Sequence, residues 1–221
     1  MTTKERILKE SLTLFSEKGY SDVSVGEIAG AVGIKAPSLY KHYKNKQEIF
    51  DSCVNKFFEG MTLVRNRFYD QNTSKDNKIY ENADIDKIVE ISIGLFMFYL
   101  KDDVALKFRR MLMVERYRNS ELNNMYEELF INGAVEYEEK LFCNLIEAGI
   151  IKKEDPHIIA LRFYTPIFYL LQKYDMHPDK EEEAKEELIA MVREFCETYK
   201  GLRKQAGILG SSSAEMKASY L

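Results

Sequence analysis

The chain has 221 residues, of which 45% are hydrophobic and 31% charged, and its formal net charge is −4 at pH 7. This length and apolar content predict a folded globular protein with one large domain, or with a small domain joined to a larger one. The acidic total excludes a protein that coats nucleic acid with its whole surface, but the charge is unevenly distributed. Residues 1–50 carry eight Lys and Arg against six Asp and Glu, and no carboxylate lies between Glu27 and Glu48.

Capping boxes predict where several helices begin, and the apolar spacing of three and four residues, with only four prolines, predicts an all-α fold. These boxes are Thr2 with Glu5, Ser24 with Glu27, Asn45 with Glu48, and Asp179 with Glu182. The first helix is expected to reach about Lys18. A third helix of about two turns is expected to have Pro37 at its first position, where a missing N–H is tolerated.

The fourth predicted helix carries an apolar stripe at 4-3-4-3-4 spacing, made by Phe50, Val54, Phe57, Met61, Val64 and Phe68. At about 1.5 Å per residue this helix is a strut of roughly 36 Å that leads from the N-terminal region into a second domain. The polar segment from Asp70 to Asp84 is predicted to be a loop.

Helices are then expected near residues 84–101, 103–116, 120–148, 156–176 and 180–200, with Gly149 ending the third of these. We divide the chain into a helix-turn-helix domain at 1–46, a helical domain at 47–200 and a tail at 201–221 that is either flexible or a short helix.

Residues Ser24 to Tyr43 fit a helix-turn-helix unit, in which Ala29 is small where two helices cross and Gly33 permits a left-handed turn. The shared core would be Ile28, Val32, Ile34 and Leu39. A short second helix of this kind enters the DNA major groove and reads base edges with its N-terminal turn. The alternative, an ordinary solvated face rich in lysine, is less favoured because the cap, the turn and the absence of carboxylates coincide.

The first 50 residues resemble the DNA-binding domain of TetR-family transcriptional regulators. The resemblance lies in the "LF..KGY" end of the first helix, the "IA..VGI" turn and the run "LYKHYKNKQEIF". Pro37 stands where the family often has Gly, and Tyr43 where it usually has Phe. The rest of the chain shares the family's helical layout and length.

This resemblance implies contacts with double-stranded operator DNA at matching positions. The residues implied are Ser24, Val25, Tyr40, His42 and Lys46 at phosphates, Lys35, Ala36, Pro37 and Ser38 at bases, and Lys41 at either. The alternatives are a core ring for Tyr40 and an ordinary solvated side chain for His42.

The resemblance also implies a pocket for a small, largely hydrophobic effector in the second domain, where aromatic residues are dense. The candidate lining residues are Phe68, Phe96, Tyr99, Tyr126, Phe130, Phe163, Tyr164 and Ile167. For each ring, ordinary core packing is the alternative. Pro166 is expected to kink its helix, which either opens a cavity or only improves packing.

The last two predicted helices resemble the dimer interface of the family, a four-helix bundle made by two copies. The stripes are Ile159, Phe163, Ile167, Leu170 and Tyr174 on one helix and Leu188, Val192, Phe195 and Tyr199 on the other. The alternative is that these residues are buried within the monomer.

Nothing in the sequence predicts an enzyme, because the three histidines are scattered and no catalytic motif occurs. Cys53, Cys143 and Cys196 lie far apart, which argues against a disulfide, metal or redox site. The apolar run containing Arg162 and Pro166 is interrupted, and the other long run is too short to cross a bilayer. With no export signal, we expect a cytoplasmic protein without cofactor or membrane contact.

The function predicted from these features is a homodimeric, ligand-responsive repressor that binds palindromic DNA. The strut would transmit effector binding to the recognition helices. Two alternatives remain open at this point. One is a DNA-binding regulator whose second domain is controlled by a protein partner, and the other is a lipid-binding or drug-binding helical module with a vestigial N-terminal domain.

Overall fold

A computed structural model describes residues 1–68 and 85–201 of the chain, and those residues confirm the all-α prediction. Within these two ranges there is no strand, and Ile151 and Lys200 form an isolated antiparallel bridge. No helix in the described ranges is long and apolar enough to cross a membrane. The loop predicted at 70–84 and the tail beyond Gly201 lie outside the described residues.

Four helices make up the N-terminal part of the fold: α1 (Thr3–Lys18), α2 (Val25–Val32), α3 (Ala36–Leu39) and α4 (Lys46–Phe68). Two of the three capping boxes predicted there, at Thr2 and at Ser24, are confirmed. Gly33 ends α2 in the left-handed conformation with φ of 74°. The local signals of the sequence therefore determine the starts of α1 and α2 and the turn that follows α2.

Helix α3 is shorter than predicted. It is a single turn with Lys35 at the N-cap position, which makes no side-chain capping bond, so Ala36 takes the first helical position and Pro37 the second. The predicted box at Asn45 is confirmed in one direction only. Asn45 accepts a hydrogen bond from the amide of Glu48 at 2.8 Å, but the Glu48 carboxylate accepts from the amide of Lys44 at 2.6 Å.

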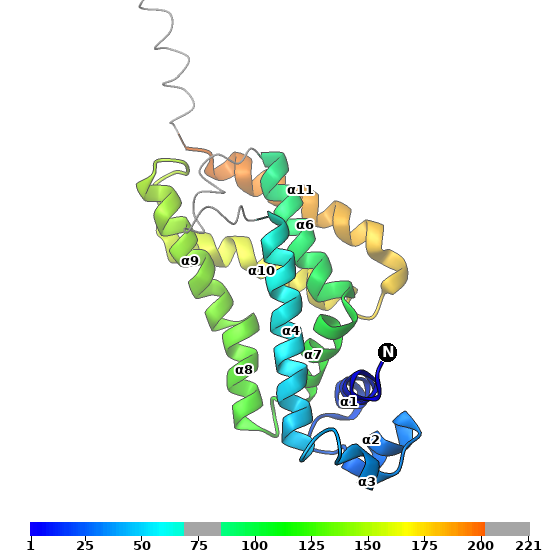
Figure 1. The fold of residues 1–221 in the computed structure, drawn as a ribbon. Helices are drawn as coiled ribbons and strands as arrows, with labels where there is room; N and C mark the ends of the chain where they lie inside the picture. The colour runs from blue at the N-terminus through cyan, green and yellow to red at the C-terminus, as the bar shows by residue number, and fades with distance from the viewer. Residues whose placement is uncertain (69–84, 202–221) are drawn as a thin grey trace, which may run out of the picture.

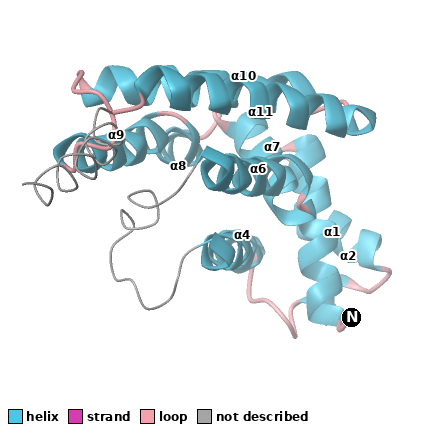
Figure 2. Cartoon of the chain, turned by 90° about the horizontal axis from the view of Figure 1, so that it is seen from above, coloured by secondary structure: helices cyan, strands magenta, loops and turns pink. Residues whose placement is uncertain are grey.

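Figure 1 shows α4 rising from this N-terminal domain into a larger helical domain, with α10 passing behind it. The helices of the larger domain are α6 (Ile85–Lys101), α7 (Asp103–Glu115), α8 (Ser120–Phe130), α9 (Asn132–Glu147), α10 (Pro156–Tyr174) and α11 (Glu181–Tyr199). Seen from above, α10 lies across the side of the domain opposite α4 (Figure 2). The larger domain is therefore several helices thick between these two elements.

The helix predicted at 120–148 is divided into α8 and α9, so that prediction is wrong. The break falls at Ile131, whose φ of −123° and ψ of −90° are not helical. Gly133 allows the first turn of α9 to approach the end of α8, because a Cβ at this position would overlap the backbone carbonyl oxygen of Glu128. An apolar pattern that continues through a break cannot reveal the break. The C-terminal stop at Gly149 is confirmed by its φ of 69°.

The predicted box at Asp179 is also wrong. Pro178–Lys180 form a short 3-10 helix, and α11 begins at Glu181 without a side-chain cap. Acidic side chains in the first turn of α11 favour the helix dipole in place of a cap. Glu181 also forms an ion pair with Lys185 at 2.7 Å, one turn further along α11.

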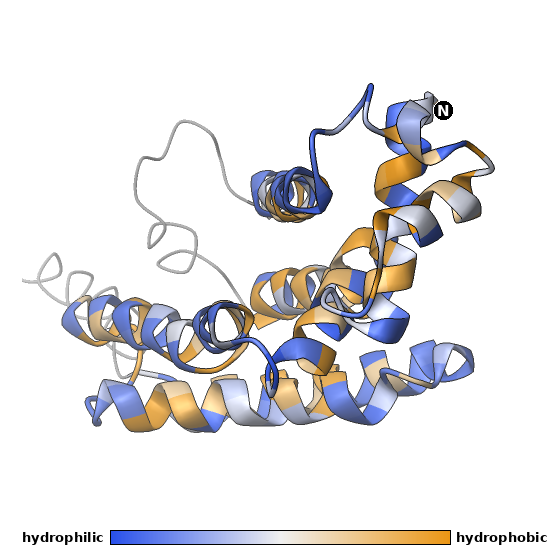
Figure 3. Cartoon of the chain, turned by 90° about the horizontal axis from the view of Figure 1, so that it is seen from below, coloured by the Kyte–Doolittle hydropathy of each residue, from blue (hydrophilic) through white to orange (hydrophobic). Residues whose placement is uncertain are grey.

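One hydrophobic core extends through both domains. The largest cluster joins Ile7 and Phe15 of α1 to Phe57 of α4 and Phe108 of α7, and the last two rings stack with centroids 4.6 Å apart. Apolar and polar stretches alternate along the helices, as expected when each buries one face (Figure 3). The shared core means that a movement of α4 relative to α7 has to repack buried rings.

Candidate DNA-binding surface and effector cavity

The turn between α2 and α3 places a set of polar side chains on the outside of the molecule. Ala29 and Leu39 are buried where the two helices meet, and the amide of Ile34 donates to the carbonyl of Ala29 at 2.9 Å. Lys35, Pro37, Tyr40 and Lys41 are consequently exposed, whereas Ala36, Ser38 and His42 are half-buried.

Tyr40 and Tyr43 take different roles in this unit. The Tyr40 side chain is 53% exposed, so the alternative that places it in the core is wrong. Tyr43 is the buried ring, 3% exposed, at the position where the family usually has Phe. A phenol hydroxyl on an exposed ring is able to donate to a phosphate oxygen.

Ser24 and Val25, the other residues expected near phosphate, lie at the start of α2. The Ser24 hydroxyl takes part in the capping box with Glu27. Bonds to Ser24 and to Lys18 lower the pKa of Glu27 to about 2, with the backbone amide of Ser24 as the largest cause. This carboxylate therefore stays ionised near neutral pH and holds the Ser24 backbone at the start of α2.

Lys46 points inward, away from the place expected of a phosphate ligand. Its ammonium donates to the carbonyls of Tyr20 at 2.9 Å, Ser21 at 3.3 Å and Val23 at 2.9 Å, and it lies 4.4 Å from the centre of the Tyr20 ring. An ammonium has three protons to donate. The structure thus uses Lys46 to tie the loop between α1 and α2 to the start of α4, which does not support the predicted phosphate contact.

A buried carboxylate links the N-terminal domain to α7, and no sequence pattern predicted this contact. Glu115, fully buried at the end of α7, accepts from the amide of Ser21 at 2.7 Å and from its hydroxyl at 2.8 Å. Gly19, with φ of 90°, leaves space for this carboxylate. Arg118 and Asp22 form an exposed ion pair beside it at 2.5 Å. The loop after α1 is therefore held on the larger domain.

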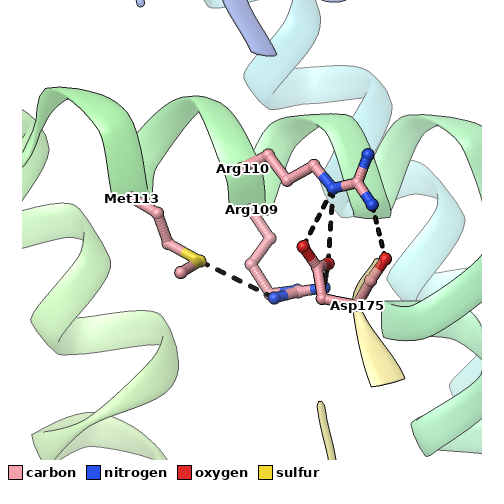
Figure 4. Close-up of polar contacts among 4 residues, drawn as sticks. All are labelled: Arg109, Arg110, Met113 and Asp175. Carbon is pink, nitrogen blue, oxygen red and sulfur yellow. Dashed lines mark hydrogen bonds and ion pairs between the residues drawn. The ribbon is translucent and has the colours of Figure 1, made fainter. Parts of the chain in front are cut away.

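The same helix α7 is bonded to the end of α10 (Figure 4). Asp175 forms ion pairs with Arg109, which is fully buried, and with Arg110, whose Nε lies 3.1 Å from Oδ2 of Asp175. Arg110 also donates to the backbone carbonyl of Asp175, and Arg109 contacts the sulfur of Met113 at 3.7 Å. Helix α7 thus carries polar contacts to the N-terminal domain at one end and to α10 nearer its middle.

The larger domain contains a cavity of about 860 Å³ between α4, α6, α8, α9, α10 and α11. This volume is in the range of small-molecule sites. Six of the eight predicted residues line it: Phe96, Tyr99, Phe130, Phe163, Tyr164 and Ile167. Tyr126 does not line it, because its ring packs 4.3 Å from the guanidinium of Arg116. Phe68 ends α4, and its side chain is outside the described part of the structure.

Two tyrosines of the cavity wall have their hydroxyls engaged by the protein. Tyr99 donates to the sulfur of Met61 at 3.4 Å, and Tyr164 donates to the carbonyl of Phe130 at 2.8 Å. Burial raises the pKa of Tyr99 to about 12 and also raises the pKa of Tyr164. Both phenols are therefore neutral at physiological pH.

Glu138 of α9 also lines the cavity, and the sequence did not single it out. Its Oε2 is buried and has no hydrogen-bond partner among the described residues. Burial raises the pKa of this carboxyl to about 7. A hydrophilic residue between apolar positions of a helix is ordinarily solvated, so no sequence signal could have placed it on the cavity wall.

The apolar stripes predicted for dimerisation are mostly core residues of the monomer, and that interpretation of them is wrong. Leu170 and Tyr174 pack with Leu188 and Val192 in one cluster, while Ile159 and Tyr199 belong to another. A different set of apolar side chains on α10 is exposed: Ile158, Leu161 and Tyr169, followed by Met176 just after the helix.

No group of three or more His, Cys, Asp or Glu side chains in the described ranges is arranged to hold a metal ion. Cys53, Cys143 and Cys196 are free thiols, and burial raises the pKa of Cys53 to about 12. A thiol with such a pKa is neutral and unreactive at physiological pH.

Comparison with known proteins agrees with this geometry. Residues 7–53 match the model of the family described as bacterial regulatory proteins, tetR family. The chain is 28% identical over 204 residues to the biofilm operon icaADBC HTH-type negative transcriptional regulator IcaR of Staphylococcus epidermidis, covering 87% of this chain and 98% of that protein. It is 25% identical over 198 residues to IcaR of Staphylococcus aureus, with the same coverage.

Solved structures show the same fold. A putative TetR-family transcriptional regulator from Mesorhizobium loti superimposes with a TM-score of 0.63 at 17% identity, covering 90% of this chain and 96% of that one. The SmeT–triclosan complex superimposes with a TM-score of 0.62 at 18% identity, covering 91% and 93%. SmeT is described as the repressor of a Stenotrophomonas maltophilia multidrug efflux pump.

The exposed helix-turn-helix unit on a larger helical domain defines a DNA-binding transcriptional regulator, not an enzyme. Residues 7–53, which run from α1 into the first turns of α4, match the model of the TetR family, and nearly the whole chain is similar to IcaR. The chain as a whole shares the fold of solved TetR-family regulators.

Proposed function

We propose that the protein is a homodimeric repressor that leaves its operator when a small, largely hydrophobic molecule enters the cavity of the larger domain. Two features carry this proposal. One is the exposed segment from Gly33 to His42, which contains α3 and which we call the reading turn, and the other is a cavity of about 860 Å³ whose wall includes α4. The same helix begins beside the reading turn and ends at the cavity, so one rigid element touches both sites. Because its target is chromosomal DNA, we expect it to act in the cytoplasm.

The DNA-binding surface we propose is the outer face of α3 with the start of α2. Lys35 and Lys41 supply positive charge, Pro37 and Tyr40 are exposed beside them, and Ser24 and Val25 bring the N-terminus of α2 close to a phosphate. Half-buried Ala36, Ser38 and His42 complete the surface. Lys46 contributes by holding the α1–α2 loop in place.

A second copy is proposed to pack on the outer face of α10 and α11, which gives two reading turns and a palindromic target. Support comes from the exposed apolar side chains Ile158, Leu161 and Tyr169 on α10, of which Tyr169 is 60% exposed, and from Met176 just after the helix, which is 72% exposed. Large apolar side chains exposed on one helix face favour an interaction surface. Half-sites would then be separated by about one helical turn of DNA, or by multiples of it.

The signal is proposed to be a shift between two arrangements of the same helices. The cavity wall includes α4 and α10, and α7 is bonded to Asp175 at the end of α10 and, through Glu115, to Ser21. A molecule that moves α10 or α4 therefore moves the N-terminal domain as well. The negative regulation named for IcaR and the repressor role named for SmeT support repression over activation.

Control by a protein partner was the main alternative. The cavity favours a small molecule, because a domain regulated only by surface contacts has no reason to keep such a space between its helices. Triclosan bound to SmeT, a protein of the same fold, is consistent with this choice.

The test is operator binding. A fragment selected from genomic DNA is titrated with the protein, and fluorescence anisotropy is measured at several salt concentrations. Lys41→Ala is expected to weaken binding severalfold and to reduce the slope of log K against log salt by about 1. The matched control Lys140→Ala removes the same charge from the exposed surface of α9 and is expected to change neither value.

Two outcomes count against the proposal. Binding that does not depend on salt contradicts a phosphate contact by Lys41. Light scattering that finds a monomer at the concentration of operator binding contradicts the dimer.

A further inference from the structure

The cavity wall contains a carboxyl group, Glu138, whose charge is not balanced by any of the described residues. Glu138 lies on α9 and lines the cavity, and its Oε2 is buried without a hydrogen-bond partner among the described residues. Buried polar groups in proteins are almost always paired, because burial of an unpaired charge is unfavourable. An unpaired oxygen facing a cavity is therefore a place where a ligand group is expected.

The charged side chains of the cavity wall do not supply the missing partner. The positive charge of Arg65, in α4, lowers the pKa of the Tyr99 hydroxyl. Lys200 forms an ion pair with Glu197 at 3.4 Å. Burial raises the pKa of Glu138, and no opposing effect of a nearby positive charge accompanies it.

Neutral donors nearby are engaged as well. Tyr164 lies close enough to Glu138 for the carboxylate charge to raise the pKa of the phenol, but its hydroxyl donates to the carbonyl of Phe130 at 2.8 Å. Tyr99 donates to Met61. Among the described residues, the Glu138 carboxyl thus has no donor partner, and the space open to it is the cavity.

The remaining wall suits the apolar body of a cation. Aromatic rings of Phe96, Phe130, Phe142 and Phe163 line the cavity. Phe142 and Phe163 pack edge to face with centroids 5.6 Å apart. Aromatic faces attract organic cations, and apolar walls exclude a strongly hydrated ion such as sodium.

We propose that the effector is a hydrophobic organic cation whose positively charged nitrogen lies against Glu138 and whose rings or alkyl groups fill the rest of the cavity. This inference rests on the proposed function and specifies the chemical class of its effector. A neutral molecule of the same size would leave the carboxylate unpaired, and an anion would be repelled by it.

The experiment compares fluorescent dyes on the full chain at pH 8. Rhodamine 6G is a permanent cation, rhodamine B has the same ring system with a free carboxylate, and Nile red is a neutral dye of comparable size. Dissociation constants are measured by fluorescence anisotropy for the wild type, Glu138→Gln and Glu128→Gln. Glu128→Gln is the matched control, because this carboxylate also lines the cavity but is exposed to solvent.

The wild type is expected to bind rhodamine 6G at least tenfold more tightly than rhodamine B. Glu138→Gln is expected to weaken rhodamine 6G at least tenfold and to change Nile red less than twofold, whereas Glu128→Gln changes neither. The wild type should also bind rhodamine 6G more tightly than neutral Nile red, and this comparison needs no variant.

The inference is overturned if rhodamine 6G does not bind, if it binds no more tightly than Nile red, or if Glu138→Gln affects Nile red as much as rhodamine 6G. Operator release, measured with each dye, separates this inference from the proposed function. If Nile red releases the operator and the cation shows no preference for Glu138, the repressor proposal stands and the cation inference fails.

Discussion

The N-terminal domain and the larger domain present their functional groups in opposite directions. In the first, Lys35, Tyr40 and Lys41 point outward from a unit built by residues close in sequence. In the second, Glu138 and the aromatic rings point inward to a cavity whose walls come from six helices. An outward surface depends on local geometry, whereas an inward site depends on how distant segments pack.

This difference explains why removal of a single group should have different consequences in the two domains. Exposed side chains that do not cap a helix contribute little to stability, so their loss mainly changes binding. Buried charged groups of the larger domain are part of its packing, and their loss changes stability as well. The four substitutions below test this contrast in order of decreasing effect.

Asp175→Ala is expected to have the largest effect. It leaves the buried guanidinium of Arg109 without its carboxylate, at a cost of about 3–5 kcal/mol in the free energy of unfolding. Urea denaturation measures this value. Asp179→Ala, an exposed acid in the following 3-10 helix, is the control and should change the free energy by less than about 0.5 kcal/mol. An equal loss of unfolding free energy in the two variants would show that the ion pair between Asp175 and Arg109 does not stabilise the protein.

Glu138→Gln should stabilise the protein in a manner that depends on pH. The pKa of about 7 in the folded state exceeds the ordinary value of 4.5, so the folded state retains the proton that the unfolded state loses. Stability is therefore lost as pH rises from about 4.5 to 7, and the glutamine escapes this loss. The advantage of the variant should grow by roughly 2–3 kcal/mol between pH 5 and pH 8.

Thermal or urea unfolding at both pH values measures that advantage. Glu128→Gln is the control, and its effect should not change with pH between 5 and 8. A pH-independent effect of Glu138→Gln would mean that this carboxyl is not held in its neutral form by burial.

Gly19→Ala tests the junction between the two domains. The added Cβ would overlap the Glu115 carboxylate, and the φ of 90° is strained for alanine, so the substitution should destabilise by about 1–3 kcal/mol. Operator affinity should fall too, because the loop bonded to Glu115 is displaced. Gly30→Ala is the matched control: it meets open space inside α2 and should be neutral or stabilise by up to about 1 kcal/mol.

Ser24→Ala and Asp179→Ala compare a cap that formed with one that did not. Loss of the Ser24 hydroxyl removes one half of a capping box and should cost about 1 kcal/mol. Asp179 is not a cap in the structure, so its replacement should have no comparable effect. Urea denaturation of the two variants side by side decides between these outcomes, and a similar loss for both would show that Asp179 caps α11 in solution.

Sequence reasoning succeeded where one short segment contains all the information. The caps at Thr2 and Ser24, the turn at Gly33 and the stop at Gly149 were all predicted from neighbouring residues. It failed at Ile131, where the apolar pattern continues through a break, and at Asp179, where a suitable pair of residues did not form a cap.

The candidate cavity was predicted in outline, because aromatic residues are dense in the second domain and six of eight named side chains line it. The sequence did not predict whether the apolar stripes of α10 and α11 are covered within the monomer or by a second copy. Leu188 and Val192 form a periodic stripe that suits a dimer interface as well as a monomer core, and periodicity alone does not say which neighbour covers it.

The sequence by itself determined the helical class of the fold, the turn at Gly33 and the match to the TetR family model, because each depends on residues within about fifty positions of one another. Only the tertiary structure decided that Glu115 reaches Ser21, that Asp175 joins Arg109, and that Glu138 faces a cavity. These pairings join segments far apart in the chain. Their energies come from burial and from the absence of water, which no local pattern of residue types records.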